Sequence, residues 1–169
     1  MTISMYEASV PLFIHSLQSL KAILQKGQAH AEARKFDPVN LVNARLFPDM
    51  LPLSRQVQIA SDAAKGAAAR LTGTDNPKFE DTETTFPELI ARVDKTIDYL
   101  KGFKPAQFEG AETRTITVKT PNAEFTVTGL VFLRHMAIAN FYFHLTTAYA
   151  LLRHNGVELG KIDFLGRVS

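Results

Sequence analysis

Two polar side chains stand in the most apolar stretch of the chain, residues 129–154. Asn140 and His144 are four positions apart, which places them about one turn apart on the same face of a helix. A histidine titrates near neutral pH and can donate or accept a proton, and an amide can orient a ligand through hydrogen bonds. The pair is therefore the first candidate for a small-molecule site.

Three further residues are expected to border the same pocket. Gln56 and Asp49 belong to the second predicted helix and would face the pair across the bundle, and Tyr149 would line the wall. The alternative is a buried hydrogen-bond network that sets the register of two helices. The sequence favours this network for Asn140 and His144 and leaves the pocket open as the second interpretation.

Sequence motifs of several enzyme classes are absent. The chain has no cysteine, which excludes disulfides, thiolate metal ligands and a cysteine nucleophile. It also lacks a glycine-rich phosphate loop, a nucleophile elbow and a metalloprotease histidine pair. No motif therefore supports catalysis, and we predict no bound cofactor.

Composition points to one globular domain, residues 1–169. The hydrophobic fraction of 46% and the charged fraction of 21% are ordinary for such a domain. The net charge is +2 without a block of like charge, so we expect no nucleic-acid partner. The longest apolar run is shorter than the roughly 20 residues of a membrane span, and no basic leader precedes an apolar run. We expect a cytoplasmic protein without membrane contact.

Apolar residues that recur at steps of three and four predict four long helices. They cover residues 4–26, 49–71, 86–100 and 129–154, with a short connecting helix at 37–45. Pro11 should kink the first helix or leave the segment before it as a separate turn. Gly27 should loosen that helix near its end, and residues 29–35 should add a further helical turn or two. Thr85 and Glu88 match a capping box, and Asp49 is the expected N-cap of the second helix. The fourth helix is apolar on almost every side and should be the most buried.

The segments between the helices differ in pattern. Residues 74–84 are polar and acidic and are expected to form a solvated loop. Between residues 110 and 129 the hydrophobic period changes to two, which predicts a β-hairpin with its turn at residues 121–123. An isolated hairpin is marginally stable, so we expect its apolar face and the tail, residues 157–169, to pack against the bundle or a second subunit. That face is formed by Ile116, Val118, Phe125 and Val127.

Three segments carry a family resemblance: RLFPDMLPLSRQVQIASDAAKGAAARL, FEDTETTFPEL and NFYFHLTTAYALLRHNGVELGKIDFLG. In these segments and in the order of its elements, the chain resembles an uncharacterised bacterial family, a domain of unknown function within the DinB-like (YfiT-like) superfamily. The resemblance spans nearly the whole chain. It implies a mainly α fold, a four-helix bundle of up-down-down-up type with a short β-hairpin between the third and fourth long helices. It also implies a homodimer, and it carries no established activity.

Many DinB-like proteins hold a divalent metal with three histidines, one on the second helix and two that are four residues apart on the last helix. This chain departs from that pattern. His135, His144 and His154 are spaced by nine and ten residues, which turns neighbouring ones to different faces of a continuous helix. Residues 49–71 contain no histidine. We therefore predict no metal site and a degenerate remnant of the three-histidine one.

Two functions follow from these observations. The first is a bundle without metal that binds a small molecule or a protein partner. The second is a divergent metal-dependent transferase or hydrolase that acts on a small molecule, with a divalent ion held by His144, Asn140 and Gln56. The sequence alone leaves the question of enzyme activity open.

Overall fold

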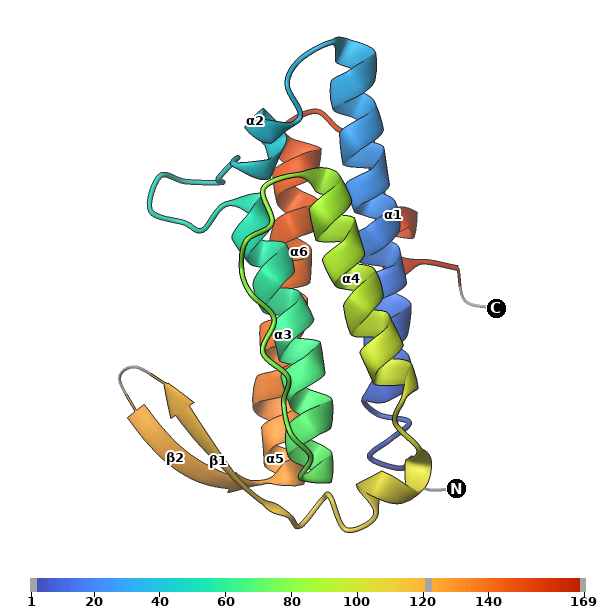
Figure 1. Ribbon diagram of the computed structural model, residues 1–169, viewed down its shortest axis with the longest axis vertical. Coiled ribbons are helices and arrows are strands. Elements are labelled where there is room, and N and C mark those ends of the chain that lie inside the picture. Colours follow the sequence, from blue (N-terminus) through green and yellow to red (C-terminus); the bar gives the residue numbers. More distant parts are fainter. Residues whose placement is uncertain (1–2, 121–122, 168–169) are drawn as a thin grey trace.

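Four long helices form the body of the protein (Figure 1). The computed structural model describes residues 3–120 and 123–167. The long helices are α1 (Val10–Arg34), α3 (Leu53–Thr72), α4 (Phe86–Lys101) and α6 (Ile138–His154). Helices α1 and α6 run in one direction and α3 and α4 in the other, which is the up-down-down-up bundle that the family resemblance implies. No helix in the described part is long and apolar enough to cross a membrane.

Short elements connect the long helices. They are α2 (Val39–Val42), the 3₁₀ turn η1 (Pro105–Phe108), β1 (Thr115–Thr120), β2 (Ala123–Thr128), α5 (Gly129–Phe132), the π-helical turn η2 (Leu133–Ala137) and α7 (Lys161–Leu165). The fourth predicted helix is therefore not one regular α-helix, because the π turn separates α5 from α6. A π turn closes its hydrogen bonds over more residues than an α turn, so it changes which side chains face each neighbour.

Proline and capping residues determine where the helices begin. Pro11 stands at the start of α1 as predicted, since proline is tolerated in the first helical turn. At α4 the Thr85 hydroxyl accepts from the Glu88 backbone N–H at 3.4 Å, and the predicted capping box is confirmed. The predicted N-cap Asp49 is wrong, because α3 begins after Pro52, whose backbone is extended. Proline disfavours the α conformation in the residue before it, so the helix cannot start earlier.

The glycine in α1 marks a close contact and not a helix end. The sequence predicts that Gly27 loosens the helix and that residues 29–35 add a further helical turn or two; α1 does include these turns, and it continues through Gly27 to Arg34 without a break. A Cβ atom at position 27 would lie 3.1 Å from both Phe86 and Leu152. The missing side chain lets α1 approach α4 and α6, and this packing outweighs the helix penalty of glycine, about 1 kcal/mol.

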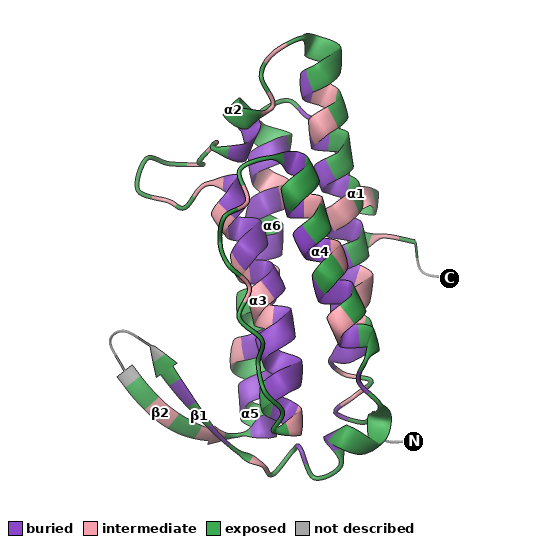
Figure 2. Cartoon of the chain, in the orientation of Figure 1, coloured by how far each residue is buried: buried purple, intermediate pink, exposed green. Residues whose placement is uncertain are grey.

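The core lies between the four long helices, and α3 is its most buried member (Figure 2). Phe13 of α1 and Phe141 of α6 are fully buried, and their rings meet edge to face with centroids 4.9 Å apart. We predicted that the fourth helix is the most buried, but it exposes Phe143. Helix α3 is covered more completely because α4 and the linker lie on one side of it and α6 lies on another.

The β-hairpin at one end of the bundle has the predicted alternation (Figure 1). Strands β1 and β2 pair antiparallel, with Ile116 opposite Val127 and Val118 opposite Phe125. Ile116 and Val118 are buried, and all four side chains join the core of the bundle. The apolar face therefore packs on the bundle of its own chain. Part of the expected turn, residues 121–122, lies outside the described residues.

Gly129 joins the hairpin to the fourth helix through a close backbone contact. Its N–H donates to the carbonyl oxygen of Arg114 at 2.8 Å, and the N–H of Leu130 donates to that of Glu112 at 3.0 Å. A Cβ atom at position 129 would collide with the carbonyl oxygen of Ala111. Only glycine permits this approach, so the base of the hairpin is held against the start of α5.

The chain crosses over between α3 and α4. Because these two helices run in the same direction, residues 74–84 return along α3 before α4 begins (Figure 1). The expected solvated loop is thus a linker that follows the bundle, with Phe79 half-buried. The C-terminal tail also packs along the bundle, where Lys26 pairs with Asp163 at 2.7 Å. His15 Nε2–H donates to the Leu165 carbonyl oxygen at 2.7 Å, so α1 holds α7 at its middle residue and at its last residue.

Candidate functional site

His144 and Gln56 form a hydrogen-bonded pair between α6 and α3. The distance from His144 Nδ1 to Gln56 Oε1 is 2.7 Å, and Gln56 Nε2 donates to the carbonyl oxygen of Leu51 at 3.0 Å. Both side chains are buried, with exposed fractions of 9% and 2%. The structure therefore brings these two predicted residues together.

These contacts determine the tautomer of His144. Since the Leu51 carbonyl accepts from the Gln56 amide nitrogen, the amide oxygen faces His144, and Nδ1 must carry the hydrogen. The other ring nitrogen, Nε2, then has a free lone pair when the ring is neutral. Burial lowers the pKa of His144 below its ordinary value of 6.5, because surroundings of low dielectric disfavour the charged ring. At neutral pH, His144 is a neutral side chain whose Nε2 can accept a hydrogen bond or a proton.

The other three predicted residues do not join this pair directly. Asn140 is exposed on α6, and Asp49 is exposed in the loop before α3. Tyr149 is half-buried, and its ring meets Phe164 of the C-terminal segment with centroids 5.8 Å apart. Five positions on an α-helix turn the side chain by about 140°, which directs Tyr149 away from the side of α6 where His144 lies. The predicted pocket is therefore distributed over different surfaces.

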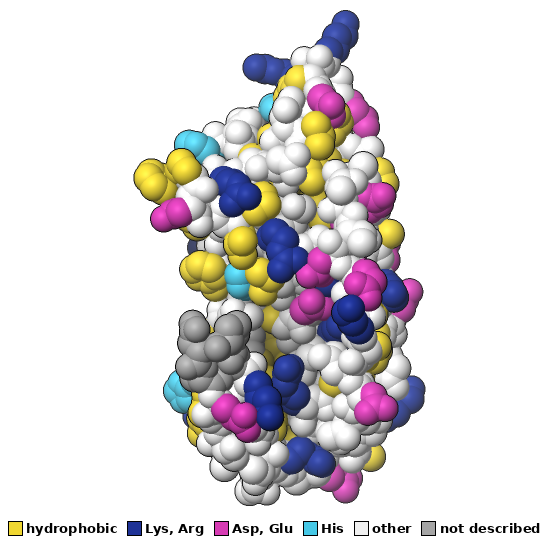
Figure 3. All heavy atoms as spheres, turned by 60° about the vertical axis from the view of Figure 1, so that its left-hand side comes forward, with side chains coloured by type: hydrophobic (Ala, Val, Ile, Leu, Met, Phe, Trp, Pro, Cys, Tyr) yellow, Lys and Arg dark blue, Asp and Glu magenta, His cyan; other side chains and the backbone are white. Residues whose placement is uncertain are grey.

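A groove of ≈ 600 Å³ lies between the hairpin, α3 and the fourth helix. Three polar side chains border it: Arg70 of α3, His135 of the π turn and Asn140 of α6. The rest of its lining is apolar and consists of Ala63, Val118, Phe132, Met136, Ala137, Ala139 and Phe143. Figure 3 shows this side of the molecule, where hydrophobic side chains gather above the hairpin. Neither His144 nor Gln56 lines the groove, but the ring of Phe143, which does, meets the His144 ring with centroids 5.1 Å apart.

The π turn helps to shape this groove. His135, Met136 and Ala137 are consecutive, and all three line it. Successive side chains on an α-helix are about 100° apart, and a π turn brings them closer in angle because it holds more residues per turn. The predicted separation of His135 from His144 assumed a continuous α-helix, which the π turn interrupts. His135 is nevertheless exposed at the groove, while His144 is buried against Gln56.

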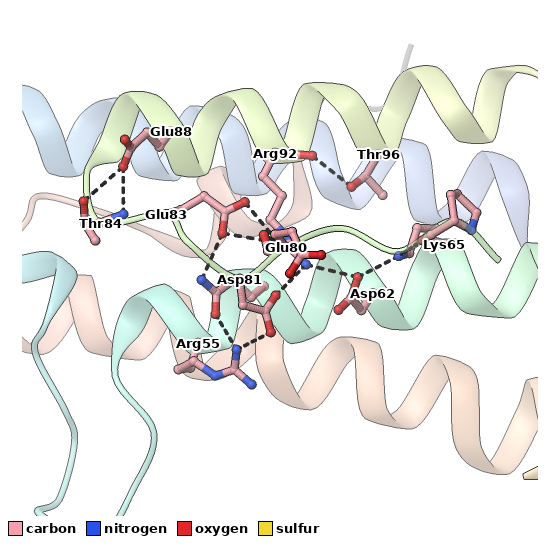
Figure 4. A network of polar contacts seen from close by, with 12 residues as sticks. Arg55, Asp62, Lys65, Glu80, Asp81, Glu83, Thr84, Glu88, Arg92 and Thr96 are labelled. Atoms are coloured by element: carbon pink, nitrogen blue, oxygen red, sulfur yellow. Dashed lines mark hydrogen bonds and ion pairs between the residues drawn. The ribbon is translucent and has the colours of Figure 1, made fainter. Parts of the chain in front are cut away.

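A larger polar cluster lies on the α4 side of α3 (Figure 4). Arg92 of α4 is its centre, with a side chain that is 1% exposed. It pairs with Asp62 of α3 at 3.1 Å, and with Asp81 and Glu83 of the linker at 3.0 Å each. Asp81 also pairs with Arg55 of α3 at 2.5 Å. The cluster thus connects α3, α4 and the linker.

Lys65 and Phe79 attach the linker at a second point. Lys65 Nζ lies 4.2 Å from the centroid of the Phe79 ring and 3.1 Å from Asp62, and it donates to the carbonyl oxygen of Pro77. Lys95 of α4 approaches the same ring, with Nζ 4.1 Å from its centroid. The charged side chains of this cluster are paired with one another or with the aromatic ring, so the cluster clamps the linker to the bundle.

Sequence reasoning missed both Arg70 and the Arg92 cluster. A basic residue in the last turn of a helix, such as Arg70, is explained by the helix dipole alone. Arg92 had a stronger signal, since it is three positions after Leu89 and four before Thr96, which are both buried. That spacing directs Arg92 inward, and a buried cation needs opposite charge nearby. The acidic linker supplies that charge.

The three-histidine metal site that the resemblance implies does not fit the residues present. Gln56 stands opposite His144 on α3, but its amide oxygen is engaged by His144 and its amide nitrogen by Leu51. Two atoms near this position could still coordinate a metal ion: the imidazole nitrogen Nε2 of His144 and the amide oxygen of Asn140. Within the described residues, no group of three or more His, Cys, Asp or Glu side chains is placed to hold a metal ion.

Comparisons with known proteins place the chain in a family. A family described as a domain of unknown function, DUF1993, matches residues 5–165. The chain belongs to this family. The DUF1993 protein is also similar to a DinB family member from Shewanella denitrificans, whose crystal structure was determined at 1.83 Å resolution. The TM-score is 0.89 and the sequence identity 46%, over 96% of this chain and 92% of that chain. The predicted DinB-like fold is thereby confirmed. No curated protein matches.

Proposed function

We propose that this DUF1993 protein binds a small molecule in the groove between the hairpin, α3 and the fourth helix, and that it does so without a three-histidine metal site. The composition of the groove carries the proposal: an apolar lining bordered by Arg70, His135 and Asn140. Small-molecule sites are typically hollows of about 300–1,000 Å³ with mostly apolar walls and a few polar groups that orient the ligand. The volume of ≈ 600 Å³ lies within that range.

His144 lies behind the wall of the groove, where its ring meets that of Phe143 with centroids 5.1 Å apart. Gln56 holds its ring in one tautomer, and burial keeps the ring neutral at neutral pH. A catalytic role would require a second group positioned to exchange a proton with the substrate. Within the described residues, the side-chain partner of His144 is the amide of Gln56, which does not titrate. We therefore propose binding and not catalysis as the role of this site.

Protein-observed NMR with a library of small carboxylates, amides and aromatic fragments tests the groove. We expect fragments to shift the amide resonances of residues 132–143 and of Arg70. The variant Ala63→Phe should fill the groove and remove these shifts. Ala91→Phe, at an exposed position on α4, is the matched control and should retain them. Shifts that survive Ala63→Phe, or a library without hits, would contradict the proposal.

The alternative function has a direct test. A divergent metal-dependent transferase or hydrolase would hold its ion on His144, Asn140 and Gln56. We expect elemental analysis of protein purified without a His-tag to find zinc, nickel and manganese well below one ion per chain. One ion per chain that is lost in His144→Ala would reject the proposal of a metal-free site.

We also propose that the protein forms a homodimer. Phe47 and Leu51, in the loop before α3, are 64% and 42% exposed, and Figure 3 shows hydrophobic side chains gathered on one face of the molecule. Clustered apolar side chains on a surface are typical of protein contacts. Light scattering at micromolar concentration should give the mass of two chains, and Phe47→Ser should lower it. The mass of one chain for the unchanged protein would exclude the dimer. The cytoplasmic location stays a prediction.

A further inference from the structure

We infer that the groove takes an amphipathic carboxylate, with the carboxylate on Arg70 and an apolar tail along the wall formed by the hairpin and the fourth helix. The inference rests on the proposed function of the groove and adds the chemical class of the ligand. It follows from the charge of the lining, the state of Arg70 and the apolar character of the remaining wall.

The lining carries positive charge and no negative charge. Arg70 is its one permanently charged residue, and no aspartate or glutamate borders the groove in the described part of the chain. His135 and Asn140 add N–H donors at the same border. Such a site attracts an anion and repels a cation. A planar guanidinium also matches a carboxylate with two parallel hydrogen bonds.

Arg70 is held in place and retains free donors. One terminal nitrogen donates to the carbonyl oxygen of Gly66 at 3.0 Å, and the guanidinium carbon lies 5.9 Å from the centroid of the Phe132 ring. Among residues 3–120 and 123–167, no carboxylate forms an ion pair with Arg70. A guanidinium has five N–H donors, so most of them remain available to a ligand.

The remaining wall suits a hydrocarbon or aryl tail. Val118 of the hairpin and Phe132 of α5 are buried, and Met136 of the π turn belongs to the same lining. Phe143 forms part of the same wall and is 57% exposed. A tail that covers this ring removes apolar surface from water, which favours binding. The ligand therefore needs an apolar part in addition to its anionic end.

A second hollow of similar size lacks this preference. It has a volume of ≈ 670 Å³, lies between α1 and the C-terminal segment, and is bordered by Lys26, His30, Glu158 and Asp163. Charges of both signs line it, and Lys26 already pairs with Asp163 at 2.7 Å. The cation of this hollow is neutralised within the protein, whereas that of the groove is not. Among these two hollows, the groove is the one suited to an anion.

Isothermal titration calorimetry with octanoate and with octanol separates the effect of the charge from that of the tail. We expect octanoate to bind about tenfold more tightly than octanol, since charge-assisted hydrogen bonds to Arg70 are made by the carboxylate alone. Arg70→Gln should weaken octanoate about tenfold and leave octanol unchanged. Arg153→Gln removes the same charge at an exposed position on α6 outside the groove and should change neither ligand.

The other outcomes separate this inference from the function on which it rests. If octanoate and octanol bind equally well and Arg70→Gln changes neither, the groove takes neutral ligands, so the inference fails and the proposed function stands. If neither binds, the inference also fails, and the fragment library tests the proposed function independently. If octanoate and octanol both bind Ala63→Phe as tightly as the unchanged protein, these ligands lie outside the groove. That result contradicts both the inference and the proposed function of the groove. Thermal unfolding of each variant separates loss of binding from loss of fold.

Discussion

Charged side chains have opposite surroundings on the two sides of α3. Toward α4, the guanidinium of Arg92 is 1% exposed and has three carboxylate partners (Figure 4). Toward the fourth helix, Arg70 is exposed at the border of the groove, and its described hydrogen bond goes to Gly66 of its own helix. One side is closed by pairing within the protein, and the other is open to solvent and to ligands.

The difference follows from the cost of removing charge from water. A buried ion loses several kcal/mol of hydration unless opposite charges replace the water, so Arg92 requires its carboxylates. Arg70 stays hydrated and needs no partner in the protein. In this molecule, a buried cation surrounded by carboxylates therefore indicates a structural role, and a cation without a carboxylate partner beside an apolar groove indicates a binding role.

The largest expected effect is on the closed side. Arg92→Met retains an apolar stem of similar length but leaves Asp62, Asp81 and Glu83 without their central cation. Removing one partner of a buried ion cluster is strongly destabilising, and we expect a loss of about 3 kcal/mol. Urea unfolding followed by circular dichroism measures it.

The control for Arg92→Met is an ion pair at the surface. Lys101 lies 3.2 Å from Asp98, and both side chains are more than half exposed. Lys101→Ala should cost less than about 0.5 kcal/mol, as is typical of such pairs. If Arg92→Met costs no more than Lys101→Ala, the two sides of α3 do not differ in the way described.

A smaller effect is expected for the pair at the edge of the open side. Gln56→Leu removes the acceptor of the His144 Nδ1–H and leaves a buried donor unpaired, which should cost about 1–2 kcal/mol. The double variant Gln56→Leu with His144→Leu removes both partners and should recover part of this loss. Urea unfolding of the two single variants and the double variant gives the coupling free energy. A coupling of zero would show that the hydrogen bond does not stabilise the bundle.

The smallest effects are those of pH, and they should appear in different ranges on the two sides. Burial lowers the pKa of His144 below 6.5, so its contribution to stability is complete above pH 6.5 and is lost as the pH falls through the lower folded pKa. For Asp81, burial opposes ionisation, but Arg55 and Arg92 outweigh it and lower the pKa below 3.8. Its contribution is complete above that value and is lost only at more acid pH.

Thermal unfolding between pH 8 and pH 3 tests this order. We expect the unfolding temperature to decline first below pH 6.5, and His144→Leu should remove this first decline. Asp81→Asn should reduce the second decline, below pH 3.8. A first decline that persists in His144→Leu would show that another group causes it.

The framework of the fold was predictable because it depends on near neighbours in the chain. The capping box of Thr85 and the hairpin alternation of Ile116 and Val118 are confirmed, since each depends on residues a few positions away. The candidate site was predictable in part. The sequence indicated Gln56 and Asp49 as candidates to face His144, and the packing of the helices selects Gln56. Asp49 was misplaced because the start of α3 was assigned too early.

Local patterns could not reveal the groove, and they indicate that Arg92 faces inward without showing which carboxylates it meets. Arg70 borders the groove because the hairpin and the π turn meet α3 there, and no sequence signal predicted a π turn at Leu133–Ala137. Arg92 finds Asp81 and Glu83 because the linker returns along α3. The path of the linker follows from the relative direction of the two helices, which is a property of the whole bundle.

By itself the sequence determined the helices, the hairpin, the lack of thiol chemistry and the lack of histidine on the second long helix. Only the tertiary structure decided which polar groups are paired and which are open to a ligand. His144 and Gln56 are 88 positions apart, and their contact depends on how α6 packs on α3. The physical reason is that periodicity shows which residues face inward, whereas the partner that each one meets depends on the packing of segments distant in the chain.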